Sequence, residues 1–124
     1  MRQKCAGVAV LLSLALLLVV FDLSAREEDK KAKAKTWEVT VKDAKFLVGG
    51  KQQDLKIKVG DSVVWVNKDE EDHSATSEKE SKFKFDVEIP EAKKSKPLKF
   101  TKAGKFKYYC KYHDNQKGTI VVEK

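Results

Sequence analysis

The chain has 124 residues, a formal net charge of +7, two cysteines, two histidines and one methionine. A chain of this length holds one domain, with little room for a second. Two histidines are too few for a multicopper cluster or a histidine-rich dinuclear site. The only methionine is the initiator Met1, so we expect no thioether ligand from the folded part of the protein.

The first 25 residues have the order of a secretory signal peptide. Two basic residues stand near the start, an apolar run extends from Ala6 to Phe21, and the small residues Ser24 and Ala25 precede a strongly polar segment. The run is shorter than the roughly 20 residues that span a bilayer, which favours a signal peptide. A retained membrane anchor is the alternative. We predict a signal peptide over residues 1–25 and a periplasmic or otherwise exported protein without stable membrane insertion.

Removal of the signal peptide changes the meaning of the cysteines. Cleavage after Ala25 removes Cys5, so the processed chain keeps only Cys110 and forms no internal disulfide. A single cysteine is unusual in an exported protein, because an exposed thiol oxidises or pairs between molecules. We expect something to protect Cys110, and a metal ion is one candidate.

Two segments follow the signal peptide. Residues 26–35 are almost all charged or small, which predicts a disordered leader. From Thr36 onward, apolar residues alternate with polar ones as in half-buried strands, and Val63–Val66 is a continuous apolar run that suits a strand covered on both faces. The segments with this β signal are 37–42, 55–59, 63–66, 83–89, 98–100, 106–108 and 119–122. Seven to eight short strands predict an all-β sandwich over residues 36–124.

Most lysines fall on the outward positions of these predicted strands. They are interleaved with glutamate and aspartate and form no single basic stripe. We therefore interpret them as a solvated surface and expect no nucleic-acid partner.

The residues that suit a transition metal are few and fall near predicted strand ends. Cys110 and His113 lie three apart in the loop before the last predicted strand, and His73 follows the strand that contains Trp65. A thiolate with two imidazoles, completed by a weak axial donor, is a blue-copper ligand set. The same three side chains with an open position could bind zinc. A small buried cysteine with two unrelated histidines, in a sandwich that binds no metal, is the structural alternative.

Four segments together resemble the small cupredoxins of the plastocyanin, pseudoazurin and amicyanin group. They are residues 60–67 (GDSVVWVN), 73–76 (HSAT), 103–110 (AGKFKYYC) and 118–122 (GTIVV). The resemblance covers residues 36–124 and implies a Greek-key β-sandwich with one copper ion that alternates between Cu(I) and Cu(II). It also implies a monomer that exchanges electrons with redox partner proteins and is not an enzyme.

The resemblance implies the ligands residue by residue. His73 resembles the upstream imidazole ligand, Cys110 the thiolate and His113 the imidazole near the surface. Where the family's short loop ends in methionine, this chain has Gln116. Glutamine is the axial ligand of stellacyanin-like cupredoxins, so we expect Gln116 to be the axial ligand, with an exposed loop amide as the alternative.

Further functional expectations concern the surroundings of the site. The acidic run Asp69–Asp72 predicts either a docking patch for a basic partner or a solvated loop, and Lys111, Tyr112 and Lys117 form a second docking candidate around His113. Ser74 is expected to hydrogen-bond the loop that contains Cys110, His113 and Gln116, which we call the ligand loop. A one-electron carrier is the leading function, and a copper storage or delivery protein is the alternative.

Overall fold

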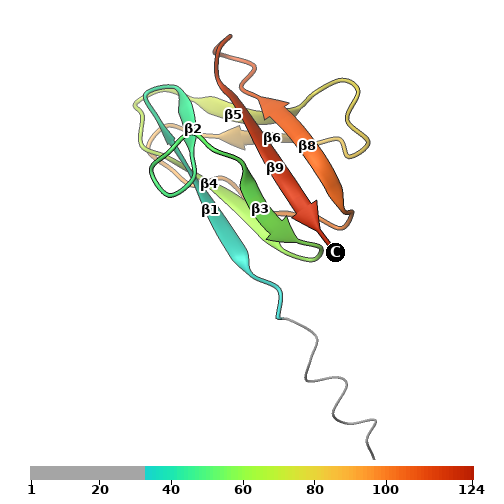
Figure 1. The fold of residues 1–124 in the computed structure, drawn as a ribbon. Coiled ribbons are helices and arrows are strands. Elements are labelled where there is room, and N and C mark those ends of the chain that lie inside the picture. Colours follow the sequence, from blue (N-terminus) through green and yellow to red (C-terminus); the bar gives the residue numbers. More distant parts are fainter. Residues whose placement is uncertain (1–32) are drawn as a thin grey trace, which may run out of the picture. The chain divides into compact units, whose positions relative to one another are not determined.

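The structure, a computed structural model, describes residues 33–124 (Figure 1). The predicted signal peptide and most of the predicted leader lie outside the described residues. The nine strands of the described region are β1 (Thr36–Lys42), β2 (Lys45–Leu47), β3 (Leu55–Lys58), β4 (Ser62–Asn67), β5 (His73–Ser77), β6 (Asp86–Ile89), β7 (Leu98–Lys99), β8 (Gly104–Tyr109) and β9 (Lys117–Glu123). No helix long and apolar enough to cross a membrane occurs between residues 33 and 124.

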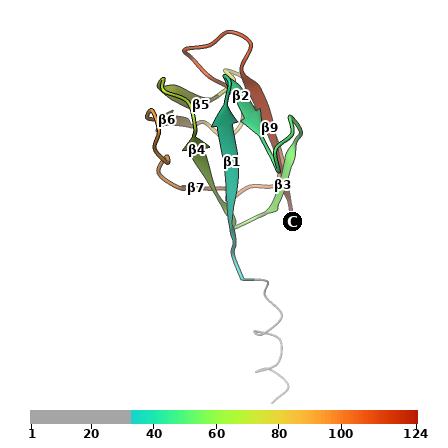
Figure 2. The ribbon, with the colours of Figure 1, turned by 90° about the vertical axis from the view of Figure 1, so that its left-hand side faces the viewer.

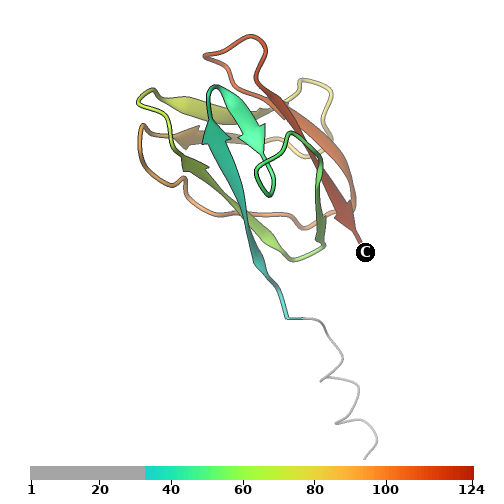
Figure 3. The ribbon, with the colours of Figure 1, turned by 60° about the vertical axis from the view of Figure 1, so that its left-hand side comes forward.

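The strands form two sheets. One sheet has the order β2-β1-β4-β7, in which β1 and β4 run parallel and pair Thr36 with Ser62 and Val41 with Asn67 (Figure 2). The other has the order β3-β9-β8-β5-β6, in which β3 and β9 run parallel and the remaining neighbours are antiparallel (Figure 3). The predicted all-β sandwich is therefore confirmed.

The core between the sheets is aromatic. Tyr108 of β8 lies with its ring centroid 4.7 Å from that of Phe46 and 5.6 Å from that of Trp65. The indole N–H of Trp65 donates to the Tyr108 hydroxyl at 3.3 Å, which satisfies two buried polar groups at once. Each such ring removes a large apolar area from water, so this cluster contributes much of the packing between the two sheets.

The strand count exceeds the prediction. β5 was not predicted, because Ser74 and Ala75 are both buried and the segment shows no alternation of apolar and polar residues. β2 was missed because the tight turn before it places Asp43 and Ala44 at positive φ, without the glycine that usually marks such a turn. Conversely, the predicted strand 83–89 begins only at Asp86.

Candidate metal centre

The loop between β8 and β9 brings Cys110 and His113 together. The Cys110 N–H donates to the Gln116 carbonyl at 2.9 Å, and the His113 N–H donates to the Cys110 carbonyl at 3.4 Å. The Gln116 N–H donates to the His113 carbonyl at 3.3 Å. These bonds close the loop on itself, so both side chains are held over the same end of the sandwich.

The first residue of β5 completes the group. β5 pairs antiparallel with β8, with Thr76 opposite Tyr109, which places His73 and Ser74 beside Cys110. The Ser74 N–H donates to Cys110 Sγ at 3.4 Å, and the Lys111 N–H donates to Ser74 Oγ at 2.9 Å. The predicted bond between Ser74 and the ligand loop is thus confirmed.

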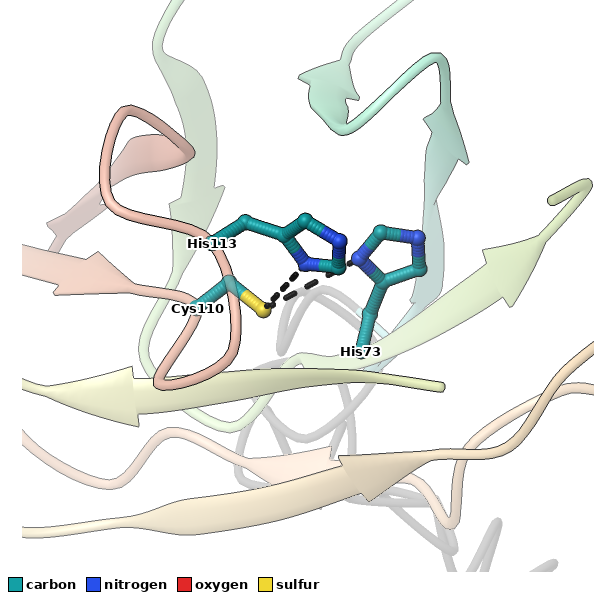
Figure 4. Close-up of side chains that lie close together, drawn as sticks. All are labelled: His73, Cys110 and His113. Carbon is teal, nitrogen blue, oxygen red and sulfur yellow. Dashed lines mark hydrogen bonds between the residues drawn. The ribbon is translucent and has the colours of Figure 1, made fainter. Parts of the chain in front are cut away.

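The three predicted donor atoms converge on one point (Figure 4). Cys110 Sγ lies 3.8 Å from Nδ1 of His73 and 3.5 Å from Nδ1 of His113, and the three ligand atoms lie within 4.8 Å of one another. Metal bonds of about 2.3 Å to sulfur and 2.0–2.1 Å to nitrogen, at tetrahedral to trigonal angles, require a separation of about 3.5–3.8 Å between those donors. This spacing between sulfur and nitrogen therefore fits a single small transition-metal ion.

Gln116 lies at the same place. Its side chain is buried, and its Oε1 is 2.8 Å from His73 Nδ1, the nitrogen that faces the thiol sulfur. Its Nε2 has no hydrogen-bond partner within residues 33–124. A buried amide with its oxygen toward the donors and its NH₂ group unpaired differs from the exposed loop amide of the alternative reading.

In each histidine, the ring nitrogen that points away from the sulfur lies within hydrogen-bond distance of a carboxylate. Asp69 Oδ2 lies 2.9 Å from His73 Nε2, and Glu71 Oε2 lies 2.9 Å from His113 Nε2. Neither role was predicted from the sequence. The spacing of four residues between Asp69 and His73 was a local signal, whereas Glu71 and His113 are 42 residues apart and only the fold joins them.

Asn67, at the end of β4, organises the acidic loop. Its side-chain amide donates to the carbonyl oxygens of Glu71 at 2.7 Å, Ile89 at 3.1 Å and Pro90 at 3.1 Å, and its Oδ1 accepts the Asp69 N–H at 2.9 Å. The run Asp69–Asp72 is therefore an anchored loop whose carboxylates mostly have partners in the fold. Glu70, Glu71 and Asp72 are nevertheless exposed, so the docking patch and the solvated loop both stay predictions.

The environment makes the Cys110 thiol acidic. Burial raises its pKa, but hydrogen bonds from His113, from the backbone N–H groups of Tyr112 and Ser74, and from His73 outweigh burial and lower the pKa to about 7. The bond to Cys110, followed by that to Glu71, raises the pKa of His113. The thiolate, which is the form that binds metal, is thus accessible near neutral pH.

The predicted docking candidate Lys111 is engaged within the fold. Its ammonium group pairs with the carboxylates of Asp86 and Glu88 on β6, and the Tyr112 hydroxyl donates to Glu88 at 3.0 Å. Tyr112 itself remains exposed. These contacts attach the ligand loop to the edge strand β6.

The chain is similar in sequence and in fold to known proteins. The family description "Cupredoxin-like domain" matches residues 11–122. The chain belongs to the cupredoxin-like family. The match begins inside the apolar N-terminal run and ends in the last strand.

Amicyanins are among the relatives of this cupredoxin. The amicyanin of Paracoccus denitrificans is 33% identical over 72 residues, which is 56% of this chain and about half (55%) of that protein. A methionine-to-glutamine variant of amicyanin, in the Cu(I) state, superimposes with a TM-score of 0.59 and 26% identity, covering 71% of this chain and 82% of the other. The amicyanin of Paracoccus versutus shows the same fold, with a TM-score of 0.60 and 24% identity, covering 77% of this chain and 87% of its own.

Proposed function

We propose that this cupredoxin is a blue copper protein that carries one electron at a time outside the cytoplasm and catalyses no bond chemistry. The convergence of Cys110 Sγ with Nδ1 of His73 and of His113 is the observation that carries this proposal. A thiolate and two imidazoles form the trigonal part of a blue-copper set. Copper, when bound, would supply the one-electron change between Cu(I) and Cu(II).

The protein's own residues would do the remaining work. His73 and Cys110 are almost fully buried, so water is kept away from their donor atoms. Hydrogen bonds fix their orientation, between the His73 ring and the Asp69 carboxylate and from the Ser74 N–H to Cys110 Sγ. A rigid sandwich that holds these donors favours similar geometry in both oxidation states. A small change in geometry is what a fast electron carrier requires.

Gln116 is the proposed axial ligand. The buried amide oxygen beside His73 Nδ1 supports this role. A glutamine at the axial position is compatible with blue-copper chemistry in general. One of the similar solved structures is an amicyanin variant in which a methionine is replaced by glutamine, in the Cu(I) state.

Partner contact is proposed at the His113 side of the molecule. The His113 side chain is 26% exposed, whereas that of His73 is fully buried, so electrons would pass through the His113 edge to a redox partner protein. The signal-peptide pattern of residues 1–25 supports a periplasmic or otherwise exported location. We propose that the protein acts there as a monomer.

Copper storage or delivery is the alternative function, and the burial of the ligands favours the carrier. The distinguishing experiment is voltammetry of the copper-loaded protein together with incubation in a strong chelator. Reversible one-electron cycling with slow copper loss supports the carrier. Irreversible cycling with rapid transfer of copper to the chelator would instead support a delivery protein.

A further inference from the structure

The solvent-facing edge of His113 has a specific partner. Nδ1 of His113 faces Cys110 Sγ, and Nε2, on the opposite side of the ring, lies 2.9 Å from Glu71 Oε2. We propose that Glu71 is a positioning residue that fixes the His113 ring and lowers the reduction potential of the copper centre. This inference rests on the proposed function, because it concerns the same site.

The backbone of Glu71 is anchored. Its carbonyl oxygen accepts a 2.7 Å hydrogen bond from the buried Asn67 side chain, which also donates to the carbonyls of Ile89 and Pro90 at the end of β6. The carboxylate is therefore presented to His113 from a loop fixed at its base. Most surface ion pairs join two long side chains without such support and contribute little.

The charge of Glu71 should act on the metal through the imidazole. A carboxylate on the outer nitrogen of a metal-bound histidine fixes the ring and makes it a stronger donor. Cu(II) carries one more positive charge than Cu(I), so the carboxylate stabilises the oxidised state more. The Glu71 side chain is 72% exposed, so salt should weaken the effect.

The neighbouring residue Glu70 provides a matched control. Glu70 is exposed, lies on the same loop, and makes no side-chain hydrogen bond or ion pair within the described part of the chain. Replacing Glu70 or Glu71 by glutamine removes the same charge from almost the same place. Only the Glu71 change also removes a charged partner from a histidine of the metal centre.

The test compares copper-loaded wild type with Glu71→Gln and Glu70→Gln by voltammetry at low and high salt. We expect Glu71→Gln to shift the Cu(II)/Cu(I) equilibrium about three- to tenfold toward Cu(I), a rise in potential of about 30–60 mV for a one-electron couple. Glu70→Gln should shift it by less than a third as much. Equal shifts in the two variants would overturn the proposal and leave the proposed function intact.

A third variant separates position from charge. Glu71→Ala removes the hydrogen-bond partner of His113 as well as the charge, whereas the amide oxygen of Glu71→Gln can still accept from Nε2–H. We expect chelators to remove Cu(II) fastest from Glu71→Ala and more slowly from Glu71→Gln. Identical removal rates in both variants and wild type would refute the positioning role. A wild-type protein that forms no copper–thiolate bond would overturn both this proposal and the proposed function.

Discussion

At the scale of single residues, the proposed axial ligation depends on which atom of the Gln116 amide faces Cys110 and the two histidines. The amide oxygen lies toward His73 Nδ1 while the amide nitrogen has no partner among residues 33–124. An amide oxygen is a harder donor than a thioether and favours Cu(II) over Cu(I).

The Gln116→Met variant tests this assignment. The thioether should favour Cu(I), so we expect the variant to have a higher reduction potential than wild type, measured by voltammetry of the copper-loaded proteins. A conservative replacement of similar length keeps the site filled, so the comparison reports on the donor atom. Equal potentials would show that Gln116 is not a ligand.

At the scale of elements, Asp61 connects the start of β1 with the end of β3, which lies in the other sheet. Its carboxylate accepts hydrogen bonds from the backbone N–H of Lys35 at 2.8 Å, from the indole N–H of Trp37 at 2.9 Å and from the backbone N–H of Lys58 at 3.0 Å. It follows Gly60, whose φ of +96° suits a glycine turn. One buried carboxylate therefore ties the start of β1 to the turn between β3 and β4.

These bonds make the fold sensitive to acid. The bond from the Lys35 N–H is the main cause that lowers the Asp61 pKa, and burial opposes it only in part. Because the folded pKa is below the unfolded value of 3.8, the stabilisation is complete above about pH 5 and is lost as the pH falls through the folded pKa. We expect Asp61→Asn to cost about 1–3 kcal/mol of unfolding free energy at pH 7.

Denaturant unfolding between pH 2 and pH 7 provides the measurement. The stability difference between wild type and Asp61→Asn should shrink toward low pH. Asp54→Asn is the control, because Asp54 is exposed and makes no side-chain hydrogen bond in the described region. A stability difference for Asp61→Asn that is constant across this pH range would contradict the role of its charge.

At the scale of the whole molecule, the sandwich joins two distant segments at one end. His73 begins β5, and residues 110–116 connect β8 to β9, so a metal ion bound by both segments would bind only the folded chain. Free Cu(II) at 100 times its dissociation constant should add about 2.7 kcal/mol of stability. For a domain of this size, that corresponds to a rise in melting temperature of about 10–20 °C.

Thermal unfolding with and without Cu(II) checks this coupling. Cys110→Ser keeps the side-chain volume nearly constant but removes the thiolate, so copper should raise its melting temperature much less. Chelation should return the loaded wild type to the metal-free value. Equal copper effects on wild type and Cys110→Ser would argue against binding at this site.

Much of this architecture could be predicted from the sequence, because the patterns that mark strands and the candidate ligands lie within short segments of the chain. Alternation around Val39 and Val41 predicted a strand whose inner face is buried, and both residues are fully buried. The cysteine and the two histidines were candidates because their side chains are rare and chemically distinctive. The structure brings their donor atoms together, while their binding of copper stays a prediction.

Other features depend on contacts that are distant in sequence. β5 carried no alternating pattern because the sheet and the ligand loop bury successive residues such as Ser74 and Ala75. Likewise, the sequence around Glu71 indicates only a surface residue, and only the fold brings its carboxylate within 2.9 Å of His113 Nε2. Such roles follow from three-dimensional proximity, which residue spacing does not encode.

The visible absorption spectrum of the purified protein with one equivalent of Cu(II) tests the central claim most directly. We predict an intense thiolate-to-copper charge-transfer band, because Cys110 Sγ lies 3.8 Å and 3.5 Å from two imidazole nitrogens, a spacing that fits one metal ion between them. Cys110→Ser should abolish that band under the same conditions. A colourless wild-type protein, whether or not copper remains bound, would contradict the assignment of a blue copper centre.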